Sequence, residues 1–322
     1  MATVSTFRAC TCSSDADLAA IAHLINTCRA TDNLESRTSI KKLQENYADP
    51  FFDIVRDLRL WQDSSGELVA MAELWRSIPE TEVVGRLAFD IHPSLRTSHL
   101  ADEIMAWAEQ RLHHAAQSLS LPLVLHSWCR DSEVLWYSLL TRLGFIPERY
   151  FFRLKRSLTE PIPPVAAPAG WTIRTVESQD AEAWIAMFNQ TFVDHWDHHP
   201  MTVDEFHYYA TLSDYDANLD LVIQAPDGEL VAFCASEIDS ERNARIGSKE
   251  GHVCLLGTRR GYRRLGLARS LLEESLKRLK LAGMEIATIG VDAQNPLGAL
   301  GFYESVGFQK ICSSTVFRKA VG

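Results

Sequence analysis

The sequence predicts an α/β protein of two similar domains in tandem, each a mixed central sheet flanked by helices. Its 322 residues suffice for about two domains of ordinary size, and 46% of them are hydrophobic, as in a globular protein. A proline-rich segment divides the chain near its middle, and short stretches of sequence recur on either side of that segment.

The recurring stretches keep a nearly constant spacing. The sequence GELVA occurs at 66–70 and again at 228–232, an offset of 162 residues. Leu143-Gly144-Phe145 corresponds to Val306-Gly307-Phe308, an offset of 163 residues. Landmarks in the same order and at the same spacing are typical of a duplicated domain.

The proline-rich segment sets the expected domain boundaries. Four prolines lie between positions 161 and 168, and such a run continues neither a helix nor a central strand. It suits a semi-rigid, extended linker. We therefore expect an N-terminal domain at 1–157, a linker at 158–170 and a C-terminal domain at 171–322.

The C-terminal domain begins with a strand and two helices. The segment 171–176 predicts the strand, and Asp180 can cap a helix that extends to about Thr191. Thr202, with Glu205 three residues later, forms a capping box that predicts a second helix.

Three strands follow in the sequence. The apolar segments 219–225 and 230–238 flank a Pro-Asp-Gly turn and predict a hairpin. The apolar segment 252–258 predicts the next strand.

The last third of this domain alternates helices and strands. Leucines at helical spacing predict an amphipathic helix over 266–281, which Gly283 ends. The segment 285–291 predicts a buried strand, and Pro296 is expected in the first turn of a helix that extends to about 306. One or two strands are expected within 308–318.

The charge and cysteine patterns exclude several classes of protein. A net charge of −10 argues against nucleic acid as the main partner. Seven irregularly spaced cysteines match neither a metal-binding pattern nor a disulfide framework, so we expect reduced thiols in a cytosolic protein. No apolar run is long enough to span a membrane, and the first residues lack the pattern of a signal peptide.

The most informative motif is RRGYRRLGLA at 259–268, between an apolar strand and a long helix. A glycine at 266 permits close approach of a ligand to the backbone, and the N–H groups at the following helix start attract anions. The four arginines add positive charge. This combination predicts a pyrophosphate-binding loop.

A second motif follows about thirty residues later. Asn295-Pro296-Leu297-Gly298-Ala299 precedes Tyr303, and Gly307-Phe308 comes next. Together the two motifs resemble motifs A and B of GNAT acetyltransferases, and the tandem arrangement is similar to that of the mycothiol synthase group. In that group only the C-terminal domain is catalytic, and the resemblance covers essentially the whole chain.

The resemblance implies acetyl-CoA as co-substrate and a set of residues that bind it. Backbone N–H groups after the arginines would hold the pyrophosphate, one strand would pair with the pantetheine arm and polarise the thioester carbonyl, and an asparagine would contact the same arm. The residues so implied are Leu256, Gly257, Thr258, Arg263, Arg264, Leu265, Gly266, Leu267, Ala268 and Asn295.

The resemblance also implies an acid and a base. Tyr303 would donate a proton to the departing thiolate; otherwise it is a helix tyrosine packed on the sheet. Many GNAT enzymes place a glutamate base eleven residues before Arg263, where this chain has His252. A histidine can serve as the base, and Glu250, on the same strand face, could act through a water or orient it. His252 could also be a polar residue without a catalytic role.

The N-terminal domain lacks the corresponding features. His99 replaces the loop glycine, Leu140 stands where the tyrosine is expected, and Gly85 stands at the position of the base. We therefore expect this domain to be catalytically inactive.

The charge distribution suggests the acceptor. Segment 175–241 contains fifteen acidic and no basic residues, whereas 242–280 contains eleven basic and three acidic ones. An acidic acceptor cleft would favour a cationic amine or an amino sugar, unless the pattern only reflects solvated faces. The dense Asp and His residues of 194–199 could bind a metal, but we expect a polar loop and no metal.

Two other functions remain open at this point. A non-catalytic, CoA-binding or sensory protein of the same fold is one, because His252 replaces the usual glutamate. A transferase that uses aminoacyl-tRNA is the other, against which the acidic net charge counts.

Overall fold

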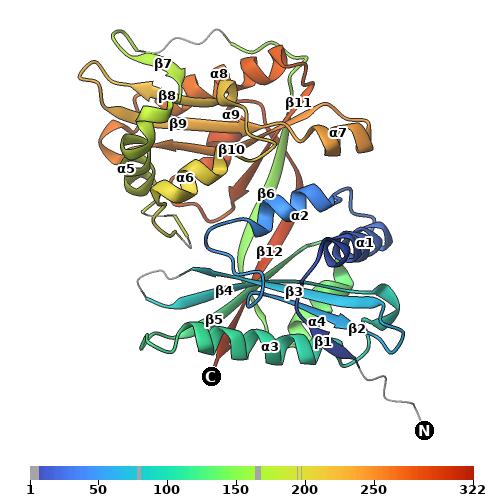
Figure 1. Ribbon diagram of the computed structural model, residues 1–322. Helices are drawn as coiled ribbons and strands as arrows, with labels where there is room; N and C mark the ends of the chain where they lie inside the picture. The colour runs from blue at the N-terminus through green and yellow to red at the C-terminus, as the bar shows by residue number, and fades with distance from the viewer. Residues whose placement is uncertain (1–6, 78–80, 164–167, 194, 197) are drawn as a thin grey trace. The chain divides into compact units, whose positions relative to one another are not determined.

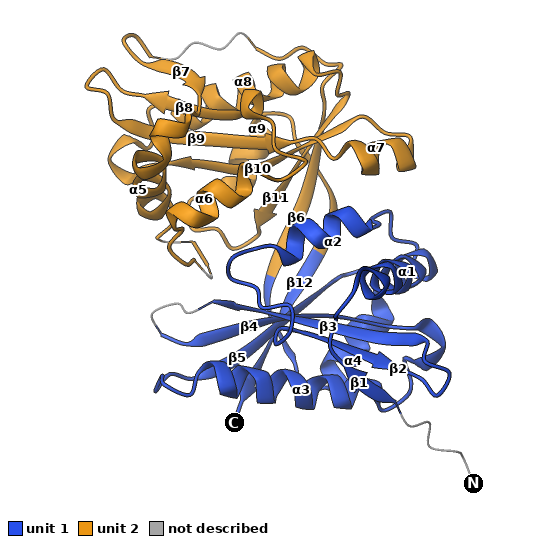
Figure 2. Ribbon diagram, viewed as in Figure 1, with its two compact units in different colours: residues 1–149, 314–322 blue, residues 150–313 orange. Residues whose placement is uncertain are grey.

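The computed structural model describes residues 7–77, 81–163, 168–193, 195–196 and 198–322 (Figure 1). The chain divides into two compact units. Unit 1 comprises residues 1–149 and 314–322, and unit 2 comprises residues 150–313 (Figure 2).

Unit 1 has a mixed sheet in the order β1-β2-β3-β4-β5-β12, in which only β4 and β5 are parallel. The strands are β1 (Arg8–Cys10), β2 (Leu58–Gln62), β3 (Leu68–Ser77), β4 (Val83–Ile91), β5 (Leu123–Arg130) and the second half of β12 (Gln309–Val321). The helices are α1 (Asp15–Thr31), α2 (Ile40–Tyr47), α3 (Leu100–Ala115) and α4 (Val134–Arg142).

Unit 2 repeats this arrangement in the order β7-β8-β9-β10-β11-β6, in which only β10 and β11 are parallel. The strands are β7 (Thr172–Thr175), β8 (Asp220–Gln224), β9 (Leu230–Glu237), β10 (Glu250–Thr258), β11 (Ile286–Asp292) and most of β6 (Ile146–Ser157). The helices are α5 (Ala181–Phe192), α6 (Val203–Tyr209), α7 (Ser240–Ile246), α8 (Leu267–Leu281) and α9 (Ala299–Ser305). The matching strand order in both units confirms the predicted duplication and fold class.

The compact units divide the chain differently from the expected boundaries at 157 and 171. Residues 151–157 of β6 pair with β11 of unit 2, and residues 314–321 of β12 pair with β5 of unit 1. Each half of the sequence therefore supplies one strand to the sheet of the other unit, and β6 and β12 both change colour in Figure 2. Positions 164–167 of the expected linker lie outside the described residues.

In both units, apolar side chains pack against the two faces of the sheet. In unit 2 the α8 and α9 face forms one core around Leu271 and Phe308, and the α5 and α6 face forms another around Trp184 and Phe233. Among described residues no helix is long and apolar enough to cross a membrane.

Local signals in the sequence account for most elements of unit 2. Thr202 and Glu205 form the expected capping box of α6, and the hairpin of β8 and β9 is present. The helix expected from Pro296 begins three residues later, at Ala299. The reason is a turn in which Leu297 N–H donates to Asn295 Oδ1 and Gly298 takes a left-handed φ of 69°. The short helix α7 was not expected.

Candidate active site

The site is built where two parallel strands part. β10 and β11 pair from Glu250 to Val253, but β10 continues to Thr258 and β11 to Asp292. Along this second half, β10 is bonded to β9 and has no partner strand on its β11 side among the described residues. That edge is the place where a ligand with amide groups can add to the strand.

A bulge at the parting point changes which residues face each side. The register between β10 and β9 shifts between Val253 and Leu255. Before the bulge His252 faces the α5 and α6 side; beyond it Leu255 and Gly257 do. A Cβ at Gly257 would lie 2.5 Å from Phe233 and 2.7 Å from Thr191, so the strand and α5 are packed too closely there for a side chain.

The loop between β10 and α8 has an unusual backbone. Arg264 has a φ of 66° and Gly266 a φ of 81°, both in the left-handed region. Such a conformation is costly for arginine and tends to occur at functional sites. Gly266 is the N-cap of α8, and no side chain caps the first N–H groups of this 15-residue helix. The loop thus presents backbone donors at a helix N-terminus, which suits an anion.

The arginines of this loop have different roles. Arg263 donates to the carbonyls of Thr258 and Thr191, both at 3.1 Å, and so fixes the loop to β10 and α5. Arg259 forms an ion pair with Glu229 at 3.1 Å. Arg260 and Arg264 are both exposed, and their guanidinium groups can meet a phosphate in solvent.

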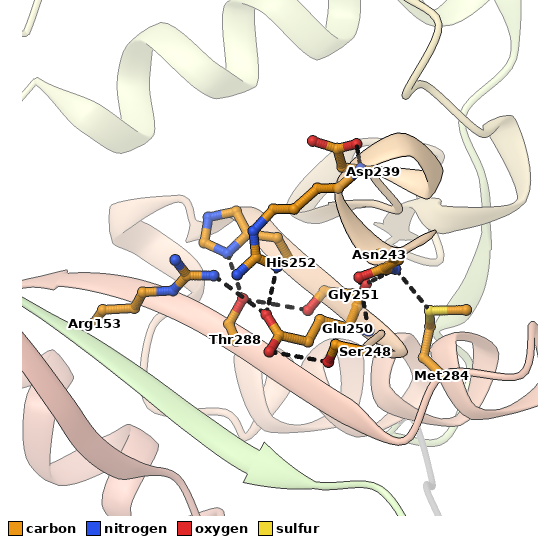
Figure 3. A network of polar contacts seen from close by, with 10 residues as sticks. Arg153, Asp239, Asn243, Ser248, Glu250, Gly251, His252, Met284 and Thr288 are labelled. Atoms are coloured by element: carbon orange, nitrogen blue, oxygen red, sulfur yellow. Dashed lines mark hydrogen bonds and ion pairs between the residues drawn. The ribbon is translucent and has the colours of Figure 1, made fainter. Parts of the chain in front are cut away.

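His252 lies in the part of β10 that pairs with β11, directly beside Thr288. Its Nδ1 is 2.9 Å from Thr288 Oγ1, and that hydroxyl is 3.4 Å from the carbonyl of Gly251 (Figure 3). When the hydroxyl donates to this carbonyl, it accepts from Nδ1–H, and the Nε2 lone pair is left as a proton acceptor. Burial, followed by the charges of Arg153 and Arg242, lowers the pKa of His252 to about 4.

Glu250 anchors a cluster of charges beside His252. Its Oε2 lies 3.5 Å from Arg153, and its Oε1 accepts from Ser248 at 3.2 Å (Figure 3). The same Oε2 accepts from Arg242 at 2.6 Å. Burial raises the pKa of this carboxyl, but the bond and the charge of Arg242 outweigh it and leave a lowered pKa. The ionised carboxylate is therefore engaged by cations, which suits an orienting role.

Tyr303 lies on α9 and is 8% exposed. Its ring lies 5.3 Å from that of Phe302 and 6.1 Å from that of Phe308. Burial raises the pKa of its hydroxyl, so this group keeps its proton at neutral pH. A protonated phenol can donate to a developing thiolate.

Asn295 follows β11, at the end of the opening between the parallel strands. Its Oδ1 accepts from Leu297 N–H at 2.9 Å, and the Asn295 carbonyl accepts from Gly298 N–H. This turn sets the start of α9 and hence the position of Tyr303. Asn295 thus has a structural task in addition to any contact with a ligand.

The segment singled out as a possible metal site is only partly described. Asp194 and Asp197 lie outside the described residues, and in the rest of it His195 Nδ1 is 2.9 Å from the carbonyl of Trp196. Within the described part of the chain, no group of three His, Cys, Asp or Glu residues could hold a metal ion.

The corresponding loop of unit 1 differs in backbone and contacts. His99 is the N-cap of α3 with a φ of −77°, where Gly266 has 81°. Arg96 forms a two-point ion pair with Asp32 at 2.6 and 2.8 Å.

The sequence count that aligned Gly85 with His252 is off by one residue, because the bulge in β10 has no counterpart in β4. Gly85 faces the α3 side, where a Cβ would lie 3.2 Å from Leu112. By strand register the counterpart of His252 is Arg86, which pairs with His126 on β5 as His252 pairs with Thr288 on β11.

Three residues of the site escaped the sequence analysis. Arg242 belongs to the unexpected helix α7. Thr288 is a polar residue within the apolar run at 286–291, and this interruption was the one signal in the sequence that could have pointed to it. Arg153 lies before the proline-rich segment, and no local pattern connects it with His252.

Comparison with known proteins gives this geometry a context. The model described as the acetyltransferase (GNAT) family matches residues 181–308. The mycothiol acetyltransferase of Acidothermus cellulolyticus is 29% identical over 204 residues, which are 61% of this chain. The matched part spans 62% of that relative's length, less than two thirds.

Solved structures match nearly the whole chain. A GCN5-related N-acetyltransferase from Sphaerobacter thermophilus has a TM-score of 0.76 at 23% identity, covering 98% of this chain and 96% of that one. A tandem GNAT protein from the clavulanic acid biosynthesis pathway has a TM-score of 0.71 at 13% identity, covering 98% of both chains. These likenesses confirm the expected tandem fold.

Proposed function

We propose that this protein transfers the acetyl group of acetyl-CoA to a primary amine of a small molecule. The match of residues 181–308 to the acetyltransferase (GNAT) family supports this proposal. The reaction takes place in unit 2. The observation that carries this proposal is the loop with left-handed Arg264 and Gly266, set beside the parting of β10 and β11.

Acetyl-CoA binds along this loop and strand edge. The N–H groups from Arg264 to Ala268 hold the pyrophosphate, with the exposed guanidinium of Arg264 as counterion. The unpaired edge of β10, from Leu256 to Thr258, bonds the pantetheine arm and directs an N–H at the thioester oxygen. Asn295 offers its side-chain amide N–H groups to the same arm.

The amine attacks the thioester carbonyl carbon directly. His252 Nε2 accepts the proton that the amine loses, and the carbon–sulfur bond breaks as the carbon–nitrogen bond forms. Glu250 holds Arg242 and Arg153 in place beside the imidazole and does not itself accept the proton. The buried phenol of Tyr303 protonates the departing thiolate, which leaves as CoA thiol.

The acceptor is a small molecule, a cationic amine or an amino sugar. The name of the Acidothermus relative, mycothiol acetyltransferase, supports a small acceptor. Glu237 faces the same side of the sheet as His252 and gives a cation a partner there. Unit 1 does not take part in the chemistry, and neither nucleic acid nor a membrane is needed. A cytosolic setting accords with the seven free thiols.

The test is acetyl-CoA turnover with a broad panel of primary amines, together with acetyl-CoA binding. Tyr303→Phe should lower kcat by about 100-fold or more and leave acetyl-CoA binding intact, because it removes only the proton donor. Tyr137→Phe, on the counterpart helix α4, is the matched control and should have no effect. Binding without turnover for every amine would instead support a non-catalytic CoA-binding protein, and absence of binding would reject both functions.

A further inference from the structure

Charged and polar side chains form one row across the sheet of unit 2. Glu237 on β9 lies opposite His252 on β10, His252 beside Thr288 on β11, and Thr288 opposite Lys155 on β6. Register partners on neighbouring strands point to the same face. This face is the one that α5 and α6 cover, because Leu154, the neighbour of Lys155, packs in the core on the α8 side.

The row has an acidic end and a basic end. Glu237 stands on one side of His252, and exposed Lys155 stands two strands away on the other, at about 10 Å by strand spacing. Arg153 on β6 adds a guanidinium group at the basic end, and Arg242 of α7 reaches the same oxygen of Glu250 that Arg153 contacts. Three cations and one carboxylate, Glu250, therefore lie in the neighbourhood of the imidazole.

The two arginines are partly exposed. The side chains of Arg153 and Arg242 are 30% and 15% accessible, and that of Glu250 is 18% accessible. These groups can therefore meet a solute, and a partly buried guanidinium binds carboxylate or phosphate more strongly than an exposed one does. A purely cationic acceptor would be repelled at this end of the row.

We propose that Arg153, Lys155 and Arg242 bind an anionic group of the acceptor, a carboxylate or a phosphate, while its amine lies at His252 on the side of Glu237. The acceptor is therefore a zwitterion, and its two charges are placed on opposite sides of the imidazole. This inference rests on the proposed function and narrows its substrate class. The inference also gives a functional reason for the pairing of β6 with β11, because β6 carries Arg153 and Lys155 into the site.

The test compares acceptors that differ only in the anionic group. The probes are 4-aminobutyrate with 4-aminobutanamide, and glucosamine 6-phosphate with glucosamine, in a steady-state assay with saturating acetyl-CoA. The measured quantity is the ratio of kcat/KM for the anionic and neutral members of a pair. Because both values come from one variant, a loss of folded protein cancels in this ratio.

The wild-type enzyme should favour the anionic member of at least one pair by about tenfold or more, mainly through KM. The pair that shows the preference identifies the anion as carboxylate or phosphate. Arg153→Gln and Lys155→Gln should each move that ratio toward one, and Arg153→Lys should retain part of it. Arg245→Gln, which removes an exposed arginine of the same helix as Arg242, is the matched control and should leave the ratio unchanged.

The outcomes separate this inference from the proposed function. If neutral acceptors are used as well as anionic ones, or if Arg153→Gln leaves the ratio unchanged, the anion site is wrong and the acetyltransferase stands. If no member of either pair and no amine of the broader panel is acetylated, the proposed function itself is rejected.

Discussion

Half-buried His252 and buried Asp220 are titratable groups whose pKa values move in opposite directions. Burial, followed by Arg153 and Arg242, lowers the pKa of His252 to about 4. Burial raises the pKa of Asp220 to about 7, although Tyr215 donates a hydrogen bond to this carboxyl at 3.3 Å. His252 is therefore neutral at neutral pH, whereas Asp220 holds its proton in mildly acidic solution.

These shifts predict opposite slopes of stability against pH. The stability that neutral His252 contributes is present above its unfolded pKa of about 6.5 and is lost as pH falls toward 4. The stability that protonated Asp220 contributes is present below about 4 and is lost as pH rises toward 7. Each slope amounts to at most about 1.4 kcal/mol per pH unit.

The free energy of unfolding should be measured by denaturant titration from pH 4.5 to 7. The excess stability of the wild type over His252→Gln should grow as pH rises, and its excess over Asp220→Asn should shrink. Parallel curves for wild type and both variants would show that neither group has the shifted pKa.

At the scale of elements, the start of α8 depends on a backbone conformation that few residues adopt. Gly266 has a φ of 81°, and a Cβ there would meet no atom within 4 Å. Gly261 in the same loop also has open space, but its φ is not positive. The two glycines therefore separate backbone strain from crowding.

Gly266→Ala should lower the free energy of unfolding by about 1 kcal/mol, because alanine is strained in the left-handed region. Gly261→Ala is the matched control and should change it by less than about 0.5 kcal/mol. Thermal or denaturant unfolding measures both. Equal effects of the two substitutions would mean that the loop takes another conformation.

Elements with local signals could be predicted from the sequence, and those without could not. The capping box of α6 and the leucine spacing of α8 are patterns of neighbouring residues, and both predictions are confirmed. The start of α9 was placed too early, because Pro296 fits a helical first turn as well as it fits the turn that Asn295 forms. The pairing of β6 with β11 brings Arg153 beside Glu250, although the two residues are 97 positions apart in the sequence. Local sequence patterns cannot predict a contact between residues so far apart.

At the scale of the whole molecule, the exchange of β6 and β12 makes the two halves of the chain depend on each other. A fragment 1–157 lacks the strand that pairs with β5, and a fragment 158–322 lacks the strand that pairs with β11. An unpaired strand edge in the middle of a domain invites aggregation. The proline-rich segment therefore marks a division of the sequence and not of the folded units.

Each fragment expressed alone should aggregate or unfold without a cooperative transition, whereas the two expressed together should give a soluble complex. Circular dichroism with thermal unfolding and analytical ultracentrifugation measure this, with the intact chain as control. A fragment 158–322 that unfolds cooperatively at the temperature of the intact chain would contradict the exchanged strands.

Because the loops at Gly266 and His99 differ, we expect unit 2 alone to bind acetyl-CoA. This expectation can be tested by isothermal titration calorimetry of the intact protein with acetyl-CoA. We expect one equivalent to bind, with binding abolished by Gly266→Glu and unchanged by His99→Gln. Two equivalents would mean that unit 1 also binds acetyl-CoA, and no binding would contradict the acetyltransferase site.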